Sequence, residues 1–256
     1  MKPLVYFSYS MTKCGSTLAF HLAHTALELA GYPQPRFDLD AIDTGRKINF
    51  VQNVSDAQAD EMCELVEKLG YPIVLKSHNR PNPAVVKMMQ NGTALAHAAY
   101  RDPRDMALSM VDHGKKARAK GHTPFSEFLT IDDTIPGIRN QCDSLTAWLR
   151  LPNTMPLYFE DIAFDTIETA HRILAQLGII GDPEQIAHAV LTNRFTQLNT
   201  GRSNRHLSEM DPESSDKIAH EFAPLLDKFI VNRALLPEDG SIVLPPPHQL
   251  RITASE

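Results

Sequence analysis

A short string near the N-terminus combines a basic residue, a glycine and two hydroxyl groups. Thr12-Lys-Cys-Gly-Ser-Thr17 lies between a predicted strand and a predicted helix, where free backbone N–H groups and the helix dipole favour an anion. Lys13 adds positive charge, Gly15 permits close approach of the backbone, and the Ser16 and Thr17 hydroxyls can donate to phosphate oxygens. We expect a phosphate or phosphosulfate here. A turn that only begins a helix is the alternative.

The string does not follow the usual pattern of nucleoside triphosphate loops. That pattern, G-x-x-x-x-G-K-[ST], requires a leading glycine and a Gly-Lys pair, and neither occurs at residues 12–17. Magnesium triphosphate is therefore a less favoured ligand than a phosphosulfate.

A histidine follows a second predicted strand. In Lys76-Ser-His78 the first and third residues point to the same side of an extended chain, so both can face one pocket. An imidazole can accept a proton near neutral pH. His78 is thus a candidate general base, and a purely structural histidine is the alternative.

A second candidate anion site lies in the string from Tyr100 to Ser109. Arg101 is expected at a strand end, where its planar guanidinium can clamp a phosphate. Ser109 follows Asp105 by one helical turn and faces the same way as the helix start. The alternative is a solvated network of salt bridges among the two arginines and two aspartates of this string.

The elements that position these residues alternate between strands and helices. Apolar runs and periodicity predict strands at 4–8, 73–75, 93–100 and 155–159, and helices at about 15–29, 56–69, 103–112, 124–129, 138–149, 165–177, from 183 and at 212–234. Asp102 and Pro103 supply a cap and a favoured first residue for one of these helices. Such alternation predicts an α/β fold with a mostly parallel sheet and helices on both faces, and ligands then bind beyond the carboxyl ends of the strands.

Length and composition indicate one globular domain over residues 1–256, with an irregular Pro-rich tail from about 237. The formal net charge of −6 argues against nucleic acid as a partner. The first residues do not resemble a secretory signal, and no apolar stretch is long enough to span a membrane. This predicts a cytoplasmic location, and the three cysteines, odd in number and not closely spaced, indicate no disulfide framework.

Together these strings resemble the family of sulfotransferases that use 3′-phosphoadenosine 5′-phosphosulfate (PAPS), over about residues 4–203. Lys13-Cys-Gly-Ser-Thr-Leu18 is similar to the family's K-S-G-T-T-W loop, although Cys14 and Leu18 depart from it. Lys76-Ser-His78 is similar to its K-T-H segment, and Arg101 and Ser109 keep the separation of its 3′-phosphate pair. The resemblance implies a three-layer sandwich like that of P-loop NTPases.

Further strings add to this resemblance. Pro156-Leu-Tyr-Phe-Glu-Asp161 is similar to a family strand ending in Tyr-Glu-Asp, which implies that Phe159 lies near the nucleotide. Gly201-Arg-Ser203 resembles a late Arg-Lys-Gly element and nominates Arg202 for the 3′-phosphate, with Arg205 as the alternative. The family's dimerisation segment is not evident, so the oligomeric state stays open.

The resemblance implies transfer of a sulfuryl group from PAPS to a hydroxyl or amine of a small-molecule, glycan or lipid acceptor, releasing PAP. His78 would act as the base, with Lys13 and Lys76 stabilising charge on the leaving phosphate. The expected 5′-phosphosulfate contacts are Lys13, Cys14, Gly15, Ser16, Thr17 and Leu18. No metal is expected, because the eleven histidines show no ligand spacing such as His-Glu-x-x-His.

Two other functions stay open at the level of sequence. A nucleotide kinase with a divergent phosphate loop would require magnesium and ATP. A noncatalytic binder of phosphorylated adenosine nucleotides would keep the fold without the chemistry. The basic stretch at 113–118, which contains His113, is read as the surface of a helix in preference to a lid.

Overall fold

The computed structural model describes residues 4–193 and 202–227. In this part of the chain four strands form one parallel sheet in the order β2-β1-β3-β4. The strands are β1 (Val5–Ser10), β2 (Ile73–Ser77), β3 (Ala94–Tyr100) and β4 (Thr154–Tyr158). The predicted α/β fold with a parallel sheet is confirmed.

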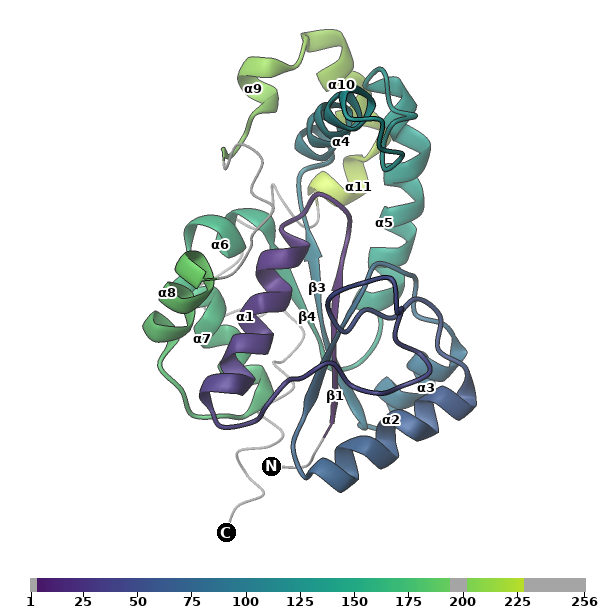
Figure 1. Cartoon of the computed structure of the whole chain (residues 1–256). Coiled ribbons are helices and arrows are strands. Elements are labelled where there is room, and N and C mark those ends of the chain that lie inside the picture. Colours follow the sequence, from purple (N-terminus) through teal and green to yellow (C-terminus); the bar gives the residue numbers. More distant parts are fainter. Residues whose placement is uncertain (1–3, 194–201, 228–256) are drawn as a thin grey trace.

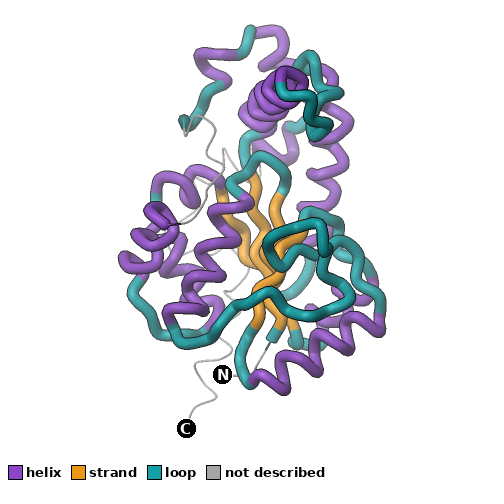
Figure 2. The backbone as a smooth tube through the Cα atoms, viewed as in Figure 1, coloured by secondary structure: helices purple, strands orange, loops and turns teal. Residues whose placement is uncertain are grey.

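Helices cover both faces of the sheet (Figures 1 and 2). One face packs against α1 (Ser16–Leu29), α7 (Thr166–Leu177) and α8 (Pro183–Asn193), and the other packs against α2 (Asp56–Leu69), α3 (Pro83–Gln90) and α5 (Ile135–Leu149). The remaining described helices are α4 (Pro103–Ala119), η1 (Asp132–Thr134), α6 (Phe159–Phe164), α9 (His206–Glu209), α10 (Pro212–Glu221) and α11 (Ala223–Leu226).

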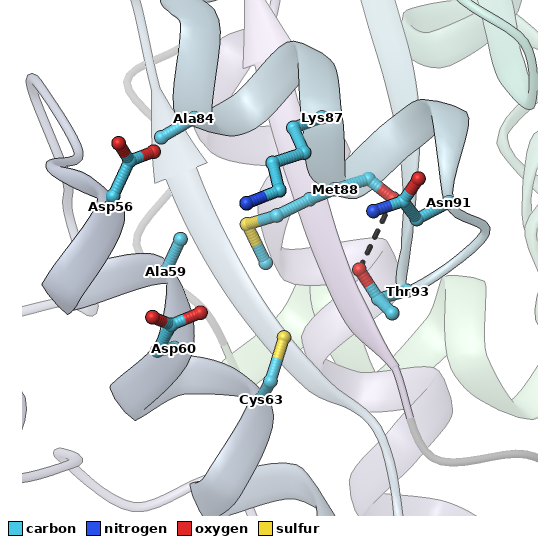
Figure 3. Close-up of a pocket in the computed structure, with 9 residues that line it drawn as sticks. All are labelled: Asp56, Ala59, Asp60, Cys63, Ala84, Lys87, Met88, Asn91 and Thr93. Atoms are coloured by element: carbon cyan, nitrogen blue, oxygen red, sulfur yellow. Dashed lines mark hydrogen bonds between the residues drawn. The ribbon is translucent and has the colours of Figure 1, made fainter.

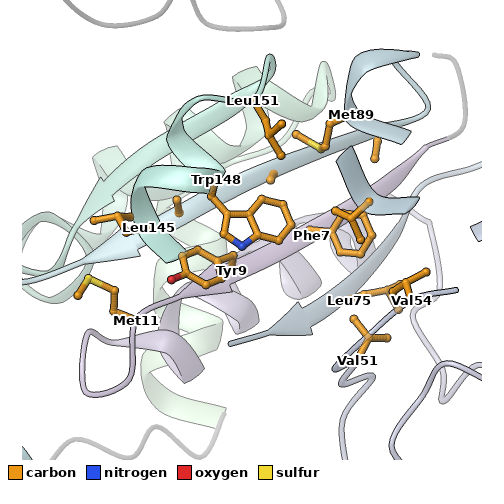
Figure 4. Packing of buried hydrophobic residues seen from close by; sticks show 14 of the residues in the cluster. Phe7, Tyr9, Met11, Val51, Val54, Leu75, Met89, Leu145, Trp148 and Leu151 are labelled. Carbon is orange, nitrogen blue, oxygen red and sulfur yellow. The ribbon is translucent and has the colours of Figure 1, made fainter. Parts of the chain in front are cut away.

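Strand β1 lies inside the sheet and is buried along its whole length. Because successive side chains of a strand point to opposite faces, Val5, Phe7 and Tyr9 enter one core cluster and Tyr6 enters the other. Trp148 of α5 stacks on Tyr9 with ring centroids 5.2 Å apart (Figure 4). Such continuous burial is typical of a parallel sheet covered on both sides.

Local signals set several helix ends as expected. Helix α4 begins with the Asp102 side chain accepting a hydrogen bond from the Arg104 backbone N–H, and Pro103 occupies its first turn. Helix α7 ends at Gly178, whose φ of 66° lies in the left-handed region that glycine tolerates. The cap at Asp102 starts α4 directly after β3, at the carboxyl edge of the sheet.

The expected helix at 124–129 was wrong. The segment forms turns, with Phe125 at a φ of 65°. Arg118 donates to the carbonyl oxygens of Ser126 and Phe128, at 2.8 and 2.9 Å, so this backbone is satisfied without helical hydrogen bonds. The aromatic rings of Phe125 and Phe128 pack together. The two residues lie three positions apart in the sequence, which is also the spacing of neighbours on one face of a helix.

Other expectations were partly wrong. The segment from 212 is interrupted after Glu221, because Pro224 follows and cannot donate to a continuing helix. Helix α4 runs to Ala119, well beyond the expected end, and α3 was missed. The tail from 237 lies outside the described residues.

Candidate active site

The loop between β1 and α1 has a backbone geometry that is compatible with anion binding. Lys13 and Gly15 both have positive φ, at 64° and 74°, a backbone form in which successive N–H groups can line a concavity. Gly15 caps α1 without a side-chain hydrogen bond, and the first turn carries no acidic residue. The first N–H groups of α1 therefore keep the positive end of the helix dipole open to a ligand.

Phe159 links this loop to Arg101. A side chain at Gly15 would meet the Phe159 ring, since a Cβ there would lie 3.2 Å from Cδ2. On the ring lies the Arg101 guanidinium, with its carbon 3.9 Å from the centroid. The phosphate loop, Phe159 and Arg101 thus form one row at the carboxyl edge of the sheet. Burial lowers the pKa of Lys13, followed by the charge of Lys116. The charge of Arg101 lowers it further, which shows that the two side chains lie near each other.

Arg101 is 5% exposed and only partly engaged. Its Nη2 donates to Asp105 Oδ2 at 3.2 Å and to the Arg202 carbonyl at 3.1 Å. Its Nε is buried and has no hydrogen-bond partner among the residues that the structure describes. A buried donor of this kind calls for an acceptor. The arrangement leaves part of the guanidinium fork for a ligand.

The salt bridges that the sequence suggested as an alternative for this string also form. Arg104 pairs with Asp102 at 2.6 Å, and Arg101 pairs with Asp105 at 3.2 Å. Asp105 is fully buried and also accepts hydrogen bonds from the backbone N–H and the ring Nδ1 of His206. The network therefore fixes Arg101 and docks α9 onto α4.

The two late arginines have different surroundings. Arg205 is buried and forms ion pairs with Asp112 at 2.7 Å and Glu209 at 2.6 Å. Arg202 is exposed, and its carbonyl is held by Arg101. Of the pair, Arg202 is the exposed residue, and its backbone lies next to Arg101.

Lys76 and His78 lie at the adjacent end of β2. Lys76 is 6% exposed, and its Nζ donates to Thr17 Oγ1 at 3.2 Å, so it reaches the phosphate loop. Burial lowers the pKa of Lys76 to about 8. Burial and the charge of Lys76 lower the pKa of His78 to about 4, against the opposing hydrogen bond to Ser10. The predicted proximity of Lys76 and His78 is present.

The hydrogen bond of His78 fixes its tautomer. Its Nδ1 lies 2.8 Å from the Ser10 carbonyl oxygen, which can only accept, so Nδ1 carries the hydrogen. In the neutral ring Nε2 is then unprotonated and able to accept a proton. Phe50 packs beside the ring at 5.7 Å between centroids. This geometry suits a general base.

Sequence reasoning missed the surroundings of Lys13. Its Nζ lies 3.0 Å from His113 Nδ1 and 5.5 Å from the centroid of Phe125. Burial, followed by Lys13 and Lys116, lowers the pKa of His113. The interpretation of the stretch at 113–118 as a helix surface was wrong for His113, which reaches the loop from α4.

Three other predicted residues contribute in a more limited way. The Cys14 and Leu18 side chains are buried in the two core clusters, so only their backbone can face a ligand at the loop. Burial raises the pKa of the Cys14 thiol well above its usual value. Ser109 lies buried on α4, two turns beyond the helix start.

A cavity of about 160 Å³ lies away from this cluster, between α2 and α3 (Figure 3). Its lining includes Asp60, Cys63, Lys87 and Thr93. Thr93 immediately precedes β3, at the sheet edge opposite the predicted site. This cavity therefore lies apart from the loop after β1 and from His78.

Within residues 4–193 and 202–227, no three His, Cys, Asp or Glu side chains gather as a metal site. Over the same residues, no helix combines the length and apolar character that crossing a bilayer requires.

The sequence matches no protein-family model and no curated protein. The structure is similar to that of mouse sulfotransferase SULT7A1 complexed with PAP, with a TM-score of 0.56 and 16% identity over 92% of this chain and 89% of that chain. It is also similar to retinol dehydratase in complex with androsterone and inactive cofactor PAP, with a TM-score of 0.56 and 15% identity over 89% of this chain and 82% of that chain.

A second retinol dehydratase structure, with retinol and PAP, has the same TM-score at 17% identity. The protein has the sulfotransferase fold. The expected resemblance in fold is confirmed.

Proposed function

We propose that this protein is a PAPS-dependent sulfotransferase. The observation that carries the proposal is the row formed by the phosphate loop, Phe159 and Arg101, because two basic sites then face one nucleotide with a phosphate at each end. The PAP present in the structural neighbours supports the same ligand.

In this proposal the two phosphates bind at different parts of the row. Lys13 and the N–H groups of residues 14–18 hold the 5′-phosphosulfate, with the Ser16 and Thr17 hydroxyls. Arg101, Ser109 and Arg202 hold the 3′-phosphate. The unpartnered Nε of Arg101 in the described structure supports this assignment.

His78 then acts on the acceptor. Its Nε2 takes the proton from the acceptor hydroxyl or amine while the new bond to sulfur forms. The bond between sulfur and the 5′-phosphate oxygen breaks, and PAP leaves with the electron pair. Lys76, next to Thr17, and Lys13 stabilise the growing negative charge. The acceptor is a small molecule, glycan or lipid, and transfer requires no metal.

The test is transfer of label from PAPS to a library of acceptors, with His78→Gln as the matched variant. The proposal requires labelled product from the wild-type protein and at least about a hundredfold less from the variant. PAP affinity should be nearly equal in the two proteins. Equal turnover would reject His78 as the base, and failure to bind PAP would reject the proposed function.

The kinase alternative has no comparable support. Lys13 precedes Gly15, whereas the lysine of a triphosphate loop follows its glycine. Magnesium-dependent ATP turnover would nevertheless decide for it.

A further inference from the structure

The segment between α1 and α2 lies against the catalytic end of β2. Lys76 donates its backbone N–H to the Asn49 carbonyl at 2.7 Å, and Val51 donates to the Lys76 carbonyl at 2.8 Å. Phe50 forms a bridge with Lys76 as a short extension of the sheet. The segment crosses in front of the sheet in Figure 1. Residues 49–51 of the segment are therefore held beside Lys76.

Arg46 is the cation of this segment that reaches toward His78. Its guanidinium carbon lies 4.9 Å from the centroid of Phe50, and the Phe50 ring lies 5.7 Å from the His78 ring. These two contacts place the charge within about 11 Å of the imidazole. The Arg46 side chain is 59% exposed, and its Nε lies 3.7 Å from Asp43 Oδ2, which is a loose ion pair.

The electrostatic effect of Arg46 agrees with this position. It contributes to the lowered pKa of Lys76, after burial. It also contributes to the lowered pKa of His78, after burial and the charge of Lys76. The field of this arginine thus extends to Lys76 and His78.

The neighbouring charges are mixed, since the segment carries three aspartates as well as three basic residues: Asp38, Asp40, Asp43, Arg36, Arg46 and Lys47. Arg36 donates to the Asp43 backbone carbonyl, and Lys47 follows Arg46 in the chain. Arg36 and Lys47 also line a hollow of about 130 Å³ against α1, together with His21 and His24, and its lining contains no carboxylate. Asp43 itself is occupied by the Gly45 N–H and by Gln52.

We propose that the acceptor carries an acidic group, and that Arg46 binds this group while the acceptor hydroxyl or amine faces His78. The inference rests on the proposed function and names its substrate class. An arginine fork binds a carboxylate through charge-assisted, often bidentate hydrogen bonds. The separation of Arg46 from His78 suits an acceptor with its acidic group one aromatic ring away from the reacting group. Phe50 is buried and contacts both side chains, so it holds Arg46 and His78 at this separation.

The test compares 4-hydroxybenzoate with its neutral analogue, methyl 4-hydroxybenzoate, as ligands of the PAP-bound protein in calorimetry. PAP affinity is measured first for each variant. We expect the acid to bind about tenfold more tightly than the ester to wild-type protein, and Arg46→Gln to abolish this preference. Arg46→Lys should retain part of it. Arg150→Gln removes an exposed cation near the opposite edge of the sheet and should retain all of it.

Equal affinity for acid and ester in the wild-type protein, including no measurable binding of either, would overturn the inference. A preference that survives Arg46→Gln unchanged would do the same. If the protein binds PAP but fails these tests, the acidic acceptor is rejected and the proposed function still holds. If the protein does not bind PAP, both the acidic acceptor and the proposed function are rejected.

Discussion

Replacing Arg101 by lysine should remove most of the preference for a 3′-phosphate. PAP and adenosine 5′-phosphate differ only in this phosphate, so the ratio of their affinities measures its contribution. Lysine keeps the positive charge next to Asp105 but lacks the planar fork of arginine. We therefore expect PAP to lose affinity and adenosine 5′-phosphate to keep it.

The expected loss of PAP affinity follows from the hydrogen-bond donors of Arg101 that are still available. Its Nη2 is already bound to Asp105 and the Arg202 carbonyl, and its buried Nε has no partner among the described residues. The substitution thus removes about one charge-assisted hydrogen bond, worth roughly 1.5–3 kcal/mol. The PAP affinity should fall by about 10- to 150-fold. Alanine is a poorer choice, because it leaves the charge of buried Asp105 without its arginine and costs about 3 kcal/mol or more in stability.

Calorimetric titration with both nucleotides measures the change. Arg104→Lys is the matched control, because Arg104 starts the same helix but pairs with Asp102. It should leave the ratio of the two affinities unchanged. If Arg101→Lys weakens both nucleotides equally, or neither, the assignment of Arg101 to the 3′-phosphate is refuted.

Three further results are expected. Gly15→Ala should lower the free energy of unfolding by about 1–2 kcal/mol, because φ is 74° and the new Cβ meets Phe159; an unchanged urea midpoint would contradict this. The pKa of the His78 imidazole should lie near 4, below its ordinary 6.5, so the ring should remain neutral as pH falls through 6 and 5. An NMR titration, with His78→Gln to assign the signal, measures this pKa, and a value of 6.5 or above would contradict the prediction. Arg205→Gln and Asp112→Asn should show a coupling of about 1 kcal/mol in a double-mutant cycle, because Asp112 is partly exposed; additive effects would disprove the pairing.

The sequence predicted those parts of the site that depend on local chemistry and on strand ends. Asp102 and Pro103 could be read as a helix start without tertiary information, and the structure confirms it. The carboxyl ends of parallel strands share one edge, so Lys76, His78 and Arg101 were expected near the loop of β1. Their proximity in the fold follows from topology more than from any single motif.

The remaining parts depend on contacts that leave no local pattern. His113 approaches Lys13 from 100 residues away, and nothing in its neighbours distinguishes it from a surface histidine. The turn at Phe125 is satisfied by Arg118, a side chain that periodicity does not take into account. Arg46 lies in an irregular segment, and its position became apparent only through the packing of Phe50 on His78.

A crystal structure of the protein with PAP tests the central proposal most directly. The account predicts one nucleotide along the row of loop, Phe159 and Arg101, with its 5′-phosphate on the N–H groups after Lys13. The 3′-phosphate should accept a hydrogen bond from Arg101 Nε. A nucleotide bound elsewhere, or with its 3′-phosphate turned away from Arg101, would contradict it.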